Sequence, residues 1–214
     1  MNKRFVKNFL MFVMGVGLLV FLYPVYLWTN QAQFSANLQL AALLSGSNVA
    51  VVLDPQTKTF GCQVQGPLPD HGCTPGAVFK NTTKDQICVT GYTKTVRSVS
   101  TSLRKKVFAE YGIDYDQPFG SYEADHLIPL ALGGNNDISN LFPEAASPYP
   151  GFKEKDVVEN YLHEQVCAGN VALSVAQEKI ANDWLAIYNS LDAKTIQDLK
   201  NKYRSWAPDN PELQ

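Results

Sequence analysis

The sequence contains no internal repeat and no low-complexity tract, which excludes solenoid and array architectures. It also has no large excess of basic residues, because 18 lysines and arginines stand against 20 aspartates and glutamates. A uniformly basic surface of the kind that grips nucleic acid is therefore excluded. The hydrophobic fraction of 45% and the charged fraction of 18% indicate a globular chain, and 214 residues leave room for one ordinary domain plus appendages.

Acidic residues are absent from the first 28 positions, although basic residues occur there. Lys3, Arg4 and Lys7 precede an almost unbroken apolar run at residues 9–28, and the next lysine is Lys58. A run of about twenty apolar residues matches the hydrocarbon core of a bilayer, and the positive flank before it predicts a cytoplasmic N-terminus. We therefore expect residues 9–28 to anchor the chain in a membrane, with the rest on the non-cytoplasmic side, periplasmic or extracellular.

The main alternative for this segment is a cleaved signal peptide, which would leave a secreted protein. Signal peptides have a shorter apolar core, of roughly 7–15 residues, and a small-x-small cleavage site. The run here is longer and no convincing site follows Trp28, so the sequence favours the anchor. A buried core helix is disfavoured by the length and the position of the run.

Cys-x-x-Cys pairs are also absent, which weakens the case for a zinc site. The four cysteines, Cys62, Cys73, Cys88 and Cys167, are separated by 11, 15 and 79 positions. In an exported chain, four cysteines indicate disulfides with three alternative pairings. The sequence does not choose among these pairings.

The pattern along the chain divides it into three regions. Residues 1–28 form the anchor or signal segment, residues 29–71 form a tether with loops, and residues 72–214 form the principal domain. Within that domain, the β-branched alternation of residues 87–97 predicts a strand. A short helix is expected at residues 101–111, before the favoured C-terminal capping residue Gly112.

The centre of the domain has the pattern of a strand, a turn, a second strand and a helix. Residues 122–132 form an apolar, strand-like segment that contains Asp125 and His126 and runs into Gly133-Gly134-Asn135-Asn136, a strong turn signal. Residues 140–143 form a second short extended piece. Residues 153–166 have helical periodicity.

The helix predicted at residues 153–166 has two distinct faces, and two further helices are expected after it. On the helix at residues 153–166, one face is apolar (Val157, Val158, Tyr161, Leu162, Val166) and the opposite face is polar (Asp156, Glu159, Asn160, His163). A capping box at Ser174-x-x-Gln177 predicts a helix that ends near Asn189. Another helix is expected at residues 192–206.

The Asp125-His126 pair carries residues suited to hydrolysis. An imidazole at a strand end can take a proton from water, because its ordinary pKa of about 6.5 is near neutrality. A carboxylate beside it, together with ligands from a nearby helix, can hold a hard divalent cation that polarises a phosphoryl oxygen. Phosphodiester hydrolysis needs these two parts, a base for water and a positive centre for phosphate.

The motif resembles a known family. The segment Tyr122-Glu-Ala-Asp-His-Leu-Ile-Pro-Leu-Ala-Leu-Gly-Gly134, followed by Asn140-Leu-Phe-Pro-Glu144, resembles the core of HNH endonucleases of the His-Me finger superfamily. The resemblance covers roughly residues 72–190, and this part of the chain is similar to a bacterial and phage subgroup of the family. Its downstream parts are Lys155-Asp156, Glu159-Asn160-x-x-His163, Val166-Cys167-x-Gly169 and Ala176-Gln177…Asp183-Trp184.

The resemblance implies an α+β fold, in which a small ββα-metal core lies within a largely helical body. It implies that His126 is the general base, that Asp125 is a metal ligand, and that Asn140 positions His126 through the backbone of its turn. It also implies one divalent ion, Mg²⁺ with Mn²⁺ or another divalent ion as the alternative, and a cut that leaves a 5′-phosphate.

The remaining metal ligand should come from the helix. Asn160 fits the Asn variant of the family's motif, while Glu159 and His163 form an i, i+4 pair on the same face. Asp156 is a fourth candidate. The alternative is that these four residues form a solvated helix face and that His126 is a hydrogen-bonded histidine at a strand end.

Acidic residues are absent between Asp85 and Glu110, where five basic residues occur. They are Lys94, Arg97, Arg104, Lys105 and Lys106. If this stretch folds beside the motif, it would supply contacts to phosphates. The alternative is a basic helix face that keeps the protein soluble.

The sequence therefore predicts a metal-dependent endonuclease, taken as a monomer, that hydrolyses DNA outside the cytoplasm, with RNA as an alternative substrate. A first alternative is a catalytically degenerate HNH-like domain that only binds nucleic acid or a cell-surface polymer. A second is a membrane-anchored structural or interaction protein whose polar motif is a turn.

Overall fold

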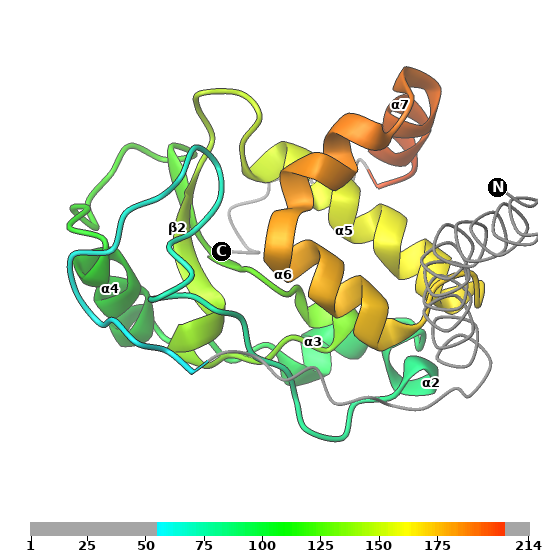
Figure 1. Cartoon of the computed structure of the whole chain (residues 1–214), viewed down its shortest axis with the longest axis horizontal. Coiled ribbons are helices and arrows are strands. Elements are labelled where there is room, and N and C mark those ends of the chain that lie inside the picture. The colour runs from blue at the N-terminus through cyan, green and yellow to red at the C-terminus, as the bar shows by residue number, and fades with distance from the viewer. Residues whose placement is uncertain (1–54, 204–214) are drawn as a thin grey trace, which may run out of the picture. The chain divides into compact units, whose positions relative to one another are not determined.

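The computed structural model of the chain describes residues 55–203, which belong to a compact unit at Asn48–Gln214 (Figure 1). The helices and strands in chain order are α2 (Lys84–Ile87), α3 (Tyr92–Val96), α4 (Thr101–Glu110), β1 (Tyr122–His126), β2 (Leu141–Ala145), α5 (Phe152–Cys167), α6 (Leu173–Ser190) and α7 (Ala193–Lys202). Two short 3-10 helices, η1 (Leu130–Leu132) and η2 (Ile138–Asn140), lie between the strands. The prediction of a mixed fold, with a small β element in a largely helical body, is confirmed.

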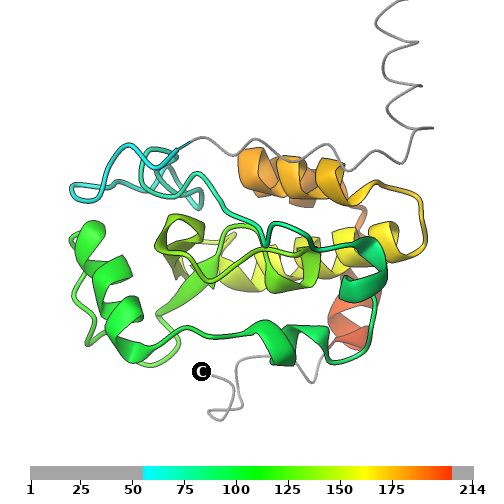
Figure 2. The same cartoon turned by 90° about the horizontal axis from the view of Figure 1, so that it is seen from below.

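The sheet consists of β1 and β2, which pair antiparallel with Asp125 opposite Phe142 and His126 opposite Leu141. It lies between α4 on one side and α5 on the other, and α6 packs on α5 (Figures 1 and 2). Because alternate residues of a strand point to opposite faces, Leu141 packs with Val107 and Phe108 of α4.

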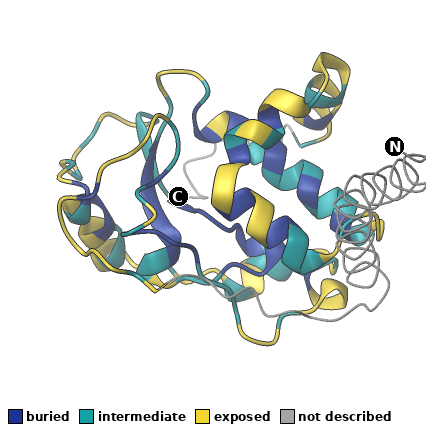
Figure 3. Cartoon of the chain, viewed as in Figure 1, coloured by how far each residue is buried: buried dark blue, intermediate teal, exposed yellow. Residues whose placement is uncertain are grey.

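The larger core lies on the other face of the sheet, where α5 and α6 meet. Phe142 of β2 packs there with Val158 and Leu162 of α5 and with Ile180 and Trp184 of α6. These side chains are at most 3% exposed, and Figure 3 shows the buried residues on the facing sides of the two helices. The core therefore holds α5 in a fixed position beside the sheet.

The turn after β1 depends on two adjacent glycines. Gly133 has a φ of 78°, a backbone conformation that residues other than glycine rarely adopt. Gly134 lies so close to the main chain that a Cβ atom would sit 1.7 Å from Ile128 O. The Gly-Gly pair thus permits a close return of the chain onto the segment that follows His126.

The prediction of disulfides is confirmed, and the pairing is Cys62–Cys73 and Cys88–Cys167. The second disulfide joins the residue after α2 to the last residue of α5. Residues 55–71, expected to be tether and loop, lie in the compact unit, where Cys62 N also donates to Glu110 O at 3.0 Å.

Residues 87–97 do not form the predicted strand, so this prediction is wrong. The structure has α2 and α3 there, separated by a turn in which Gly91 has a φ of 84°. Thr83 and Gln86 form a reciprocal capping box at the start of α2. These local signals, together with the disulfide at Cys88, outweigh the β preference of the β-branched residues, which depends strongly on context.

The capping box predicted at Ser174 is also wrong. Helix α6 begins at Leu173 after Ala172, which makes no side-chain capping bond. Gln177 Nε2 instead donates to Leu132 O at 2.7 Å, so a tertiary contact takes the side chain that the local pattern assigned to the helix start.

Three other predicted elements are confirmed within one or two residues: the helix at residues 101–111 is α4, the second extended segment is β2, and the helix at residues 153–166 is α5. The first extended segment, predicted at residues 122–132, is confirmed only as far as His126, because β1 ends there and residues 130–132 form η1. The segment at residues 9–28 and the end of the helix predicted at residues 192–206 lie outside the described residues. Within residues 55–203, no helix combines the length and the apolar character needed to cross a membrane.

Candidate functional site

The side chain of Asn140 connects the two ends of the turn between β1 and β2. Its Oδ1 accepts hydrogen bonds from Ile128 N at 2.9 Å and from Ala77 N at 3.2 Å. Its Nδ2 donates to Ile128 O and to Asn135 O, both at 2.9 Å. Asn140 is fully buried, so these four bonds satisfy an amide that has no contact with water. The Asn140 side chain therefore holds the main chain that follows His126.

His126 is the last residue of β1 and its side chain is 3% exposed. Its Nε2 lies 3.2 Å from Asn136 Oδ1. Asn136 is itself fixed, because its Nδ2 donates to Val96 O at 2.7 Å and its Oδ1 accepts from Ser98 N at 3.1 Å. Since Oδ1 can only accept, Nε2 carries the proton of the neutral imidazole, and Nδ1 keeps the lone pair of a base.

The electrostatic surroundings keep this imidazole neutral. Burial, with smaller contributions from Arg97 and Lys155, lowers the pKa of His126 to about 4 against the opposing effect of Asp125. At pH 7 the ring is therefore in the form that can accept a proton. A base in this form is a requirement for activating water.

A fully buried lysine of α5, Lys155, lies against Asp125. Its Nζ donates to Asp125 Oδ2 at 2.6 Å, to His126 O at 2.7 Å, and to Glu159 Oε1. The carboxylates of Asp125 and Glu159 are 22% and 18% exposed, so both retain access to water. Although burial raises the pKa of Asp125, the Lys155 ammonium and other neighbouring groups together outweigh this effect and hold the pKa at about 2.

Carboxyl groups outnumber cations at this place. Burial and the negative charges of Asp125 and Glu159 raise the pKa of Glu123 to about 7. Burial and Asp125 likewise raise the pKa of Glu159 to about 7, although Lys155 opposes them. The pKa of Asp156 is raised well above its ordinary value by burial and by the same neighbours. Burial is the largest cause of each of these raised pKa values, and the repulsion between neighbouring carboxylates adds to it.

Glu144 of β2 is the most buried of these carboxyl groups, at 1% exposed. Its Oε2 lies 4.0 Å from Lys155 Nζ. Among the described residues, neither of its oxygens has a hydrogen-bond partner. Burial raises the pKa of Glu144 well above the ordinary value, which favours the protonated form of the group.

The polar face predicted on α5 is only partly assembled at the site. Glu159 reaches Lys155 beside Asp125, whereas Asn160 Nδ2 donates to Asp156 O within the helix at 2.8 Å. His163 lies elsewhere, because its Nε2 bonds to Ile87 O at 3.0 Å. The structure does not bring His163 to Asp125, so His163 is excluded from the candidate site.

His163 instead lies beside a disulfide. Among residues 55–203, the one group of three potential metal-binding side chains within 4.8 Å of one another is Cys88, His163 and Cys167. Its two sulfur atoms are bonded to each other, so this group offers one imidazole and no thiolate. Asp125 and Glu159 consequently form a pair of candidate ligands rather than a preformed set of three.

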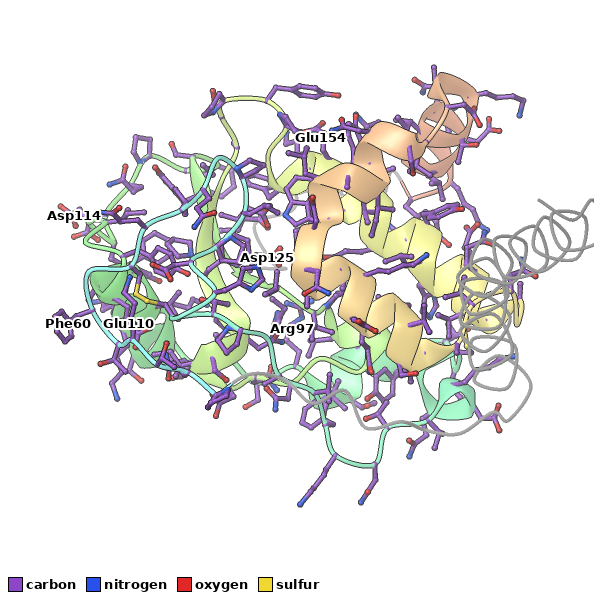
Figure 4. The ribbon with its side chains drawn as sticks, in the orientation of Figure 1. Phe60, Arg97, Glu110, Asp114, Asp125 and Glu154 are labelled. Carbon is purple, nitrogen blue, oxygen red and sulfur yellow. A yellow bond between two sulfur atoms is a disulfide. The ribbon has the colours of Figure 1, made fainter. Side chains whose placement is uncertain are left out.

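The five predicted phosphate-binding residues are divided between two places. Arg97, which follows α3, is exposed and close enough to His126, Glu123 and Glu159 to lower the pKa of each. Figure 4 labels Arg97 together with Asp125. Lys94 is an exposed residue of α3, and the remaining three residues belong to α4, on the other side of the sheet: Arg104, Lys105 and Lys106. Lys105 Nζ lies over the ring of Tyr115, 5.5 Å from its centre.

Three residues of the site were not recognised in the sequence. Asn136 was taken only as part of a turn, and Glu144 only as part of the second extended motif. Lys155 has a detectable signal, because it lies three and seven residues before Val158 and Leu162, on the face of α5 that is buried. A lysine on an apolar face indicates a buried ion pair.

Neither a family model, nor a curated protein, nor a solved structure matches this chain. The likeness to HNH endonucleases therefore rests on the motif residues themselves, and the function has to be inferred from the geometry around Asp125 and His126.

We expect Asn140→Ala to lower the free energy of unfolding by at least about 3 kcal/mol, because it removes the partners of the buried Ile128 N and O and of two half-buried main-chain groups, Ala77 N and Asn135 O. Urea unfolding of the full chain measures this difference. Asn170→Ala is the control, since its Nδ2 donates to Gln165 Oε1 on the exposed surface, and it should change stability by less than about 0.5 kcal/mol. A loss below about 1 kcal/mol for Asn140→Ala would contradict the role given to this amide.

We expect an NMR titration to give His126 a pKa of about 4. Because the unfolded imidazole has a pKa near 6.5, the unfolded state binds more protons between pH 6.5 and pH 4, and this histidine lowers stability as the pH falls through that window. At pH 4 the loss amounts to about 3 kcal/mol.

Comparison with His126→Gln isolates this effect from the carboxyl groups, whose raised pKa values act in the opposite direction. The difference between the two stability curves should grow between pH 6.5 and pH 4. His71→Gln, in an exposed turn, serves as the control. Parallel curves for wild type and His126→Gln would show that the imidazole is not desolvated.

Proposed function

We propose that this chain is a metal-dependent endonuclease that hydrolyses phosphodiester bonds of DNA, with RNA as the alternative substrate. The observation that carries the proposal is the neutral, buried imidazole of His126 next to the Asp125 carboxylate, at a strand end that the Asn140 amide connects to the following turn. This arrangement supports a base for water beside a binding place for a cation.

In this proposal His126 takes the proton from the attacking water at Nδ1. Asn136 holds Nε2, so the ring keeps one tautomer and one orientation during the reaction. A base with a fixed tautomer contributes most when the proton that it takes lies within hydrogen-bond reach. Asn140 positions the base without contacting the substrate.

The residues at the site fit a divalent ion that keeps several waters. Mg²⁺ is usually bound by one or two carboxylates and otherwise by water and substrate oxygens. Asp125 and Glu159 supply two such carboxylates, and the raised pKa values of Glu123 and Glu159 support a local demand for positive charge. Asp125 and Glu159, with Asn160 as the next candidate, would hold the ion. A bound ion would polarise a phosphoryl oxygen and stabilise the leaving alkoxide.

Contacts with the phosphate backbone would come first from Arg97, which is exposed and lies within electrostatic reach of His126. Lys94 of α3 would extend this surface. The three basic residues of α4 would bind a more distant part of the nucleic acid, because the sheet separates α4 from α5. Phosphate contacts of this kind position the substrate and do not select its sequence.

The two disulfides support a place of action in an oxidising compartment, outside the cytoplasm. With the apolar run at residues 9–28, we propose that the protein is anchored to a membrane and presents the site on the non-cytoplasmic side.

A second function is favoured by one observation. The Lys155 ammonium already bridges Asp125 and Glu159, so the two carboxylates have a positive partner without any metal ion. A domain of this kind could bind nucleic acid or a cell-surface polymer without cleaving it. Calorimetry with Mn²⁺ distinguishes the two functions, since the binding domain would not take up the ion.

The purified full-length protein should nick supercoiled plasmid DNA in the presence of Mg²⁺ or Mn²⁺, and a parallel assay with single-stranded RNA tests the alternative substrate. His126→Ala should reduce the cleavage rate by about a hundredfold or more, because a general base contributes roughly that factor. His71→Ala, in an exposed turn, should cleave at the wild-type rate. The proposal fails if the wild-type protein binds no divalent ion and leaves both substrates uncut, or if His126→Ala cleaves as fast as wild type.

A further inference from the structure

Lys155 occupies a position of α5 where an apolar residue would be expected. Its side chain is completely buried, on the same face of the helix as Val158 and Leu162. Taking an ammonium group out of water is unfavourable unless its partners replace the lost hydration. A methionine would fill the same space without that cost, so the contacts of the ammonium must account for its presence.

The ammonium group uses all three of its donors. Lys155 Nζ donates to Asp125 Oδ2 at 2.6 Å, to His126 O at 2.7 Å, and to Glu159 Oε1. A lysine has three N–H groups and no acceptor, so this set of three oxygens satisfies it completely. The group is therefore fixed in one orientation, unlike the ammonium of a surface lysine.

Two of the three partners are consecutive residues of β1, and they lie 29 and 30 positions before Lys155 in the chain. The contact to His126 is made through the main-chain oxygen of the residue that carries the imidazole. On the other side, His126 pairs with Leu141 in the β-ladder. Its backbone is thus held by the sheet and by α5 at once.

We propose that Lys155 is a positioning residue of this site, which fixes the Asp125 carboxylate and the main chain of His126 relative to each other through its three hydrogen bonds. Lys155 is too deeply buried to contact a substrate, so it acts through these two residues. The consequence for turnover rests on the proposed endonuclease function, whereas the effect on the order of β1 does not depend on it.

The test compares full-length wild type with Lys155→Met, which keeps the length of the side chain and removes its charge and its three donors. Three quantities are measured: hydrogen exchange of the backbone amides at residues 122–128, the dissociation constant of Mn²⁺ by calorimetry, and kcat and KM for plasmid cleavage. Lys200→Met is the matched control, because Lys200 Nζ contacts Glu154 Oε1 of the same helix at 3.3 Å, away from the site.

In Lys155→Met, amide exchange at residues 122–128 should become at least about tenfold faster, as expected when local order is lost. The value of kcat should fall by about a hundredfold, the effect of a small misplacement of reacting groups, while KM changes by less than about threefold. Mn²⁺ should bind more tightly, because a positive charge next to Asp125 and Glu159 has been removed. Slower turnover with tighter metal binding is a combination that general loosening of the fold does not produce.

If Lys155→Met does not fold, Lys155→Arg replaces it, since it keeps the charge but its planar fork cannot meet three converging acceptors. It should show the faster exchange and lower kcat with an unchanged Mn²⁺ dissociation constant. Exchange at residues 122–128 equal to wild type in the folded variant overturns the proposal, as does an unchanged kcat in an active protein. If the wild-type protein neither binds Mn²⁺ nor cleaves DNA, the proposed function fails, and the exchange measurement alone decides the role of Lys155.

Discussion

The geometry of the site depends on one buried amide. Asn140 bonds to both main-chain groups of Ile128 and to Asn135 O, so the chain that leaves β1 returns to it along one path. The next residue in that turn, Asn136, reaches the imidazole of His126. The orientation of the base therefore depends on a side chain that the base does not contact. The close approach of Gly134 to Ile128 O belongs to the same arrangement, because a Cβ atom there would prevent it.

The second constraint is electrostatic. The fold places a cluster of carboxyl groups around one buried ammonium and one exposed guanidinium, which belong to Lys155 and Arg97. Protonation of Glu144 relieves part of the repulsion, as the raised pKa of this group indicates. A divalent cation would relieve more of it and would leave Asp125 and Glu159 ionised.

Much of the central unit could be predicted from the sequence, because its signals are local. The Gly133-Gly134 turn marks the end of the first strand, and the 3.6-residue periodicity of α5 follows from Val158, Leu162 and Val166. The presence of disulfides could also be predicted. Their pairing could not, because Cys88 and Cys167 are 79 residues apart and meet only through the packing of α2 against α5.

The predictions that failed involve tertiary contacts. The polar face of α5 was treated as one unit, although His163 lies one turn beyond Glu159, or about 5.4 Å along the helix, and meets α2 instead of the sheet. Lys155 was quoted as part of the motif but given no role, because its partners Asp125 and His126 come from the sheet on the other side of it. Gln177 was assigned to a helix start but bonds across the core to Leu132.

The position of the metal ion is the most direct test of the central claim, that Asp125 and His126 form a metal-dependent hydrolytic site. Substoichiometric Mn²⁺, added to the isotope-labelled full-length protein, broadens the NMR signals of nuclei near the ion. The account predicts that the signals of Asp125, His126 and Glu159 broaden at the lowest Mn²⁺ concentration, and that the broadening weakens along α5 from Glu159 to His163 and Cys167. Broadening centred on His163, or no selective broadening at all, would contradict it.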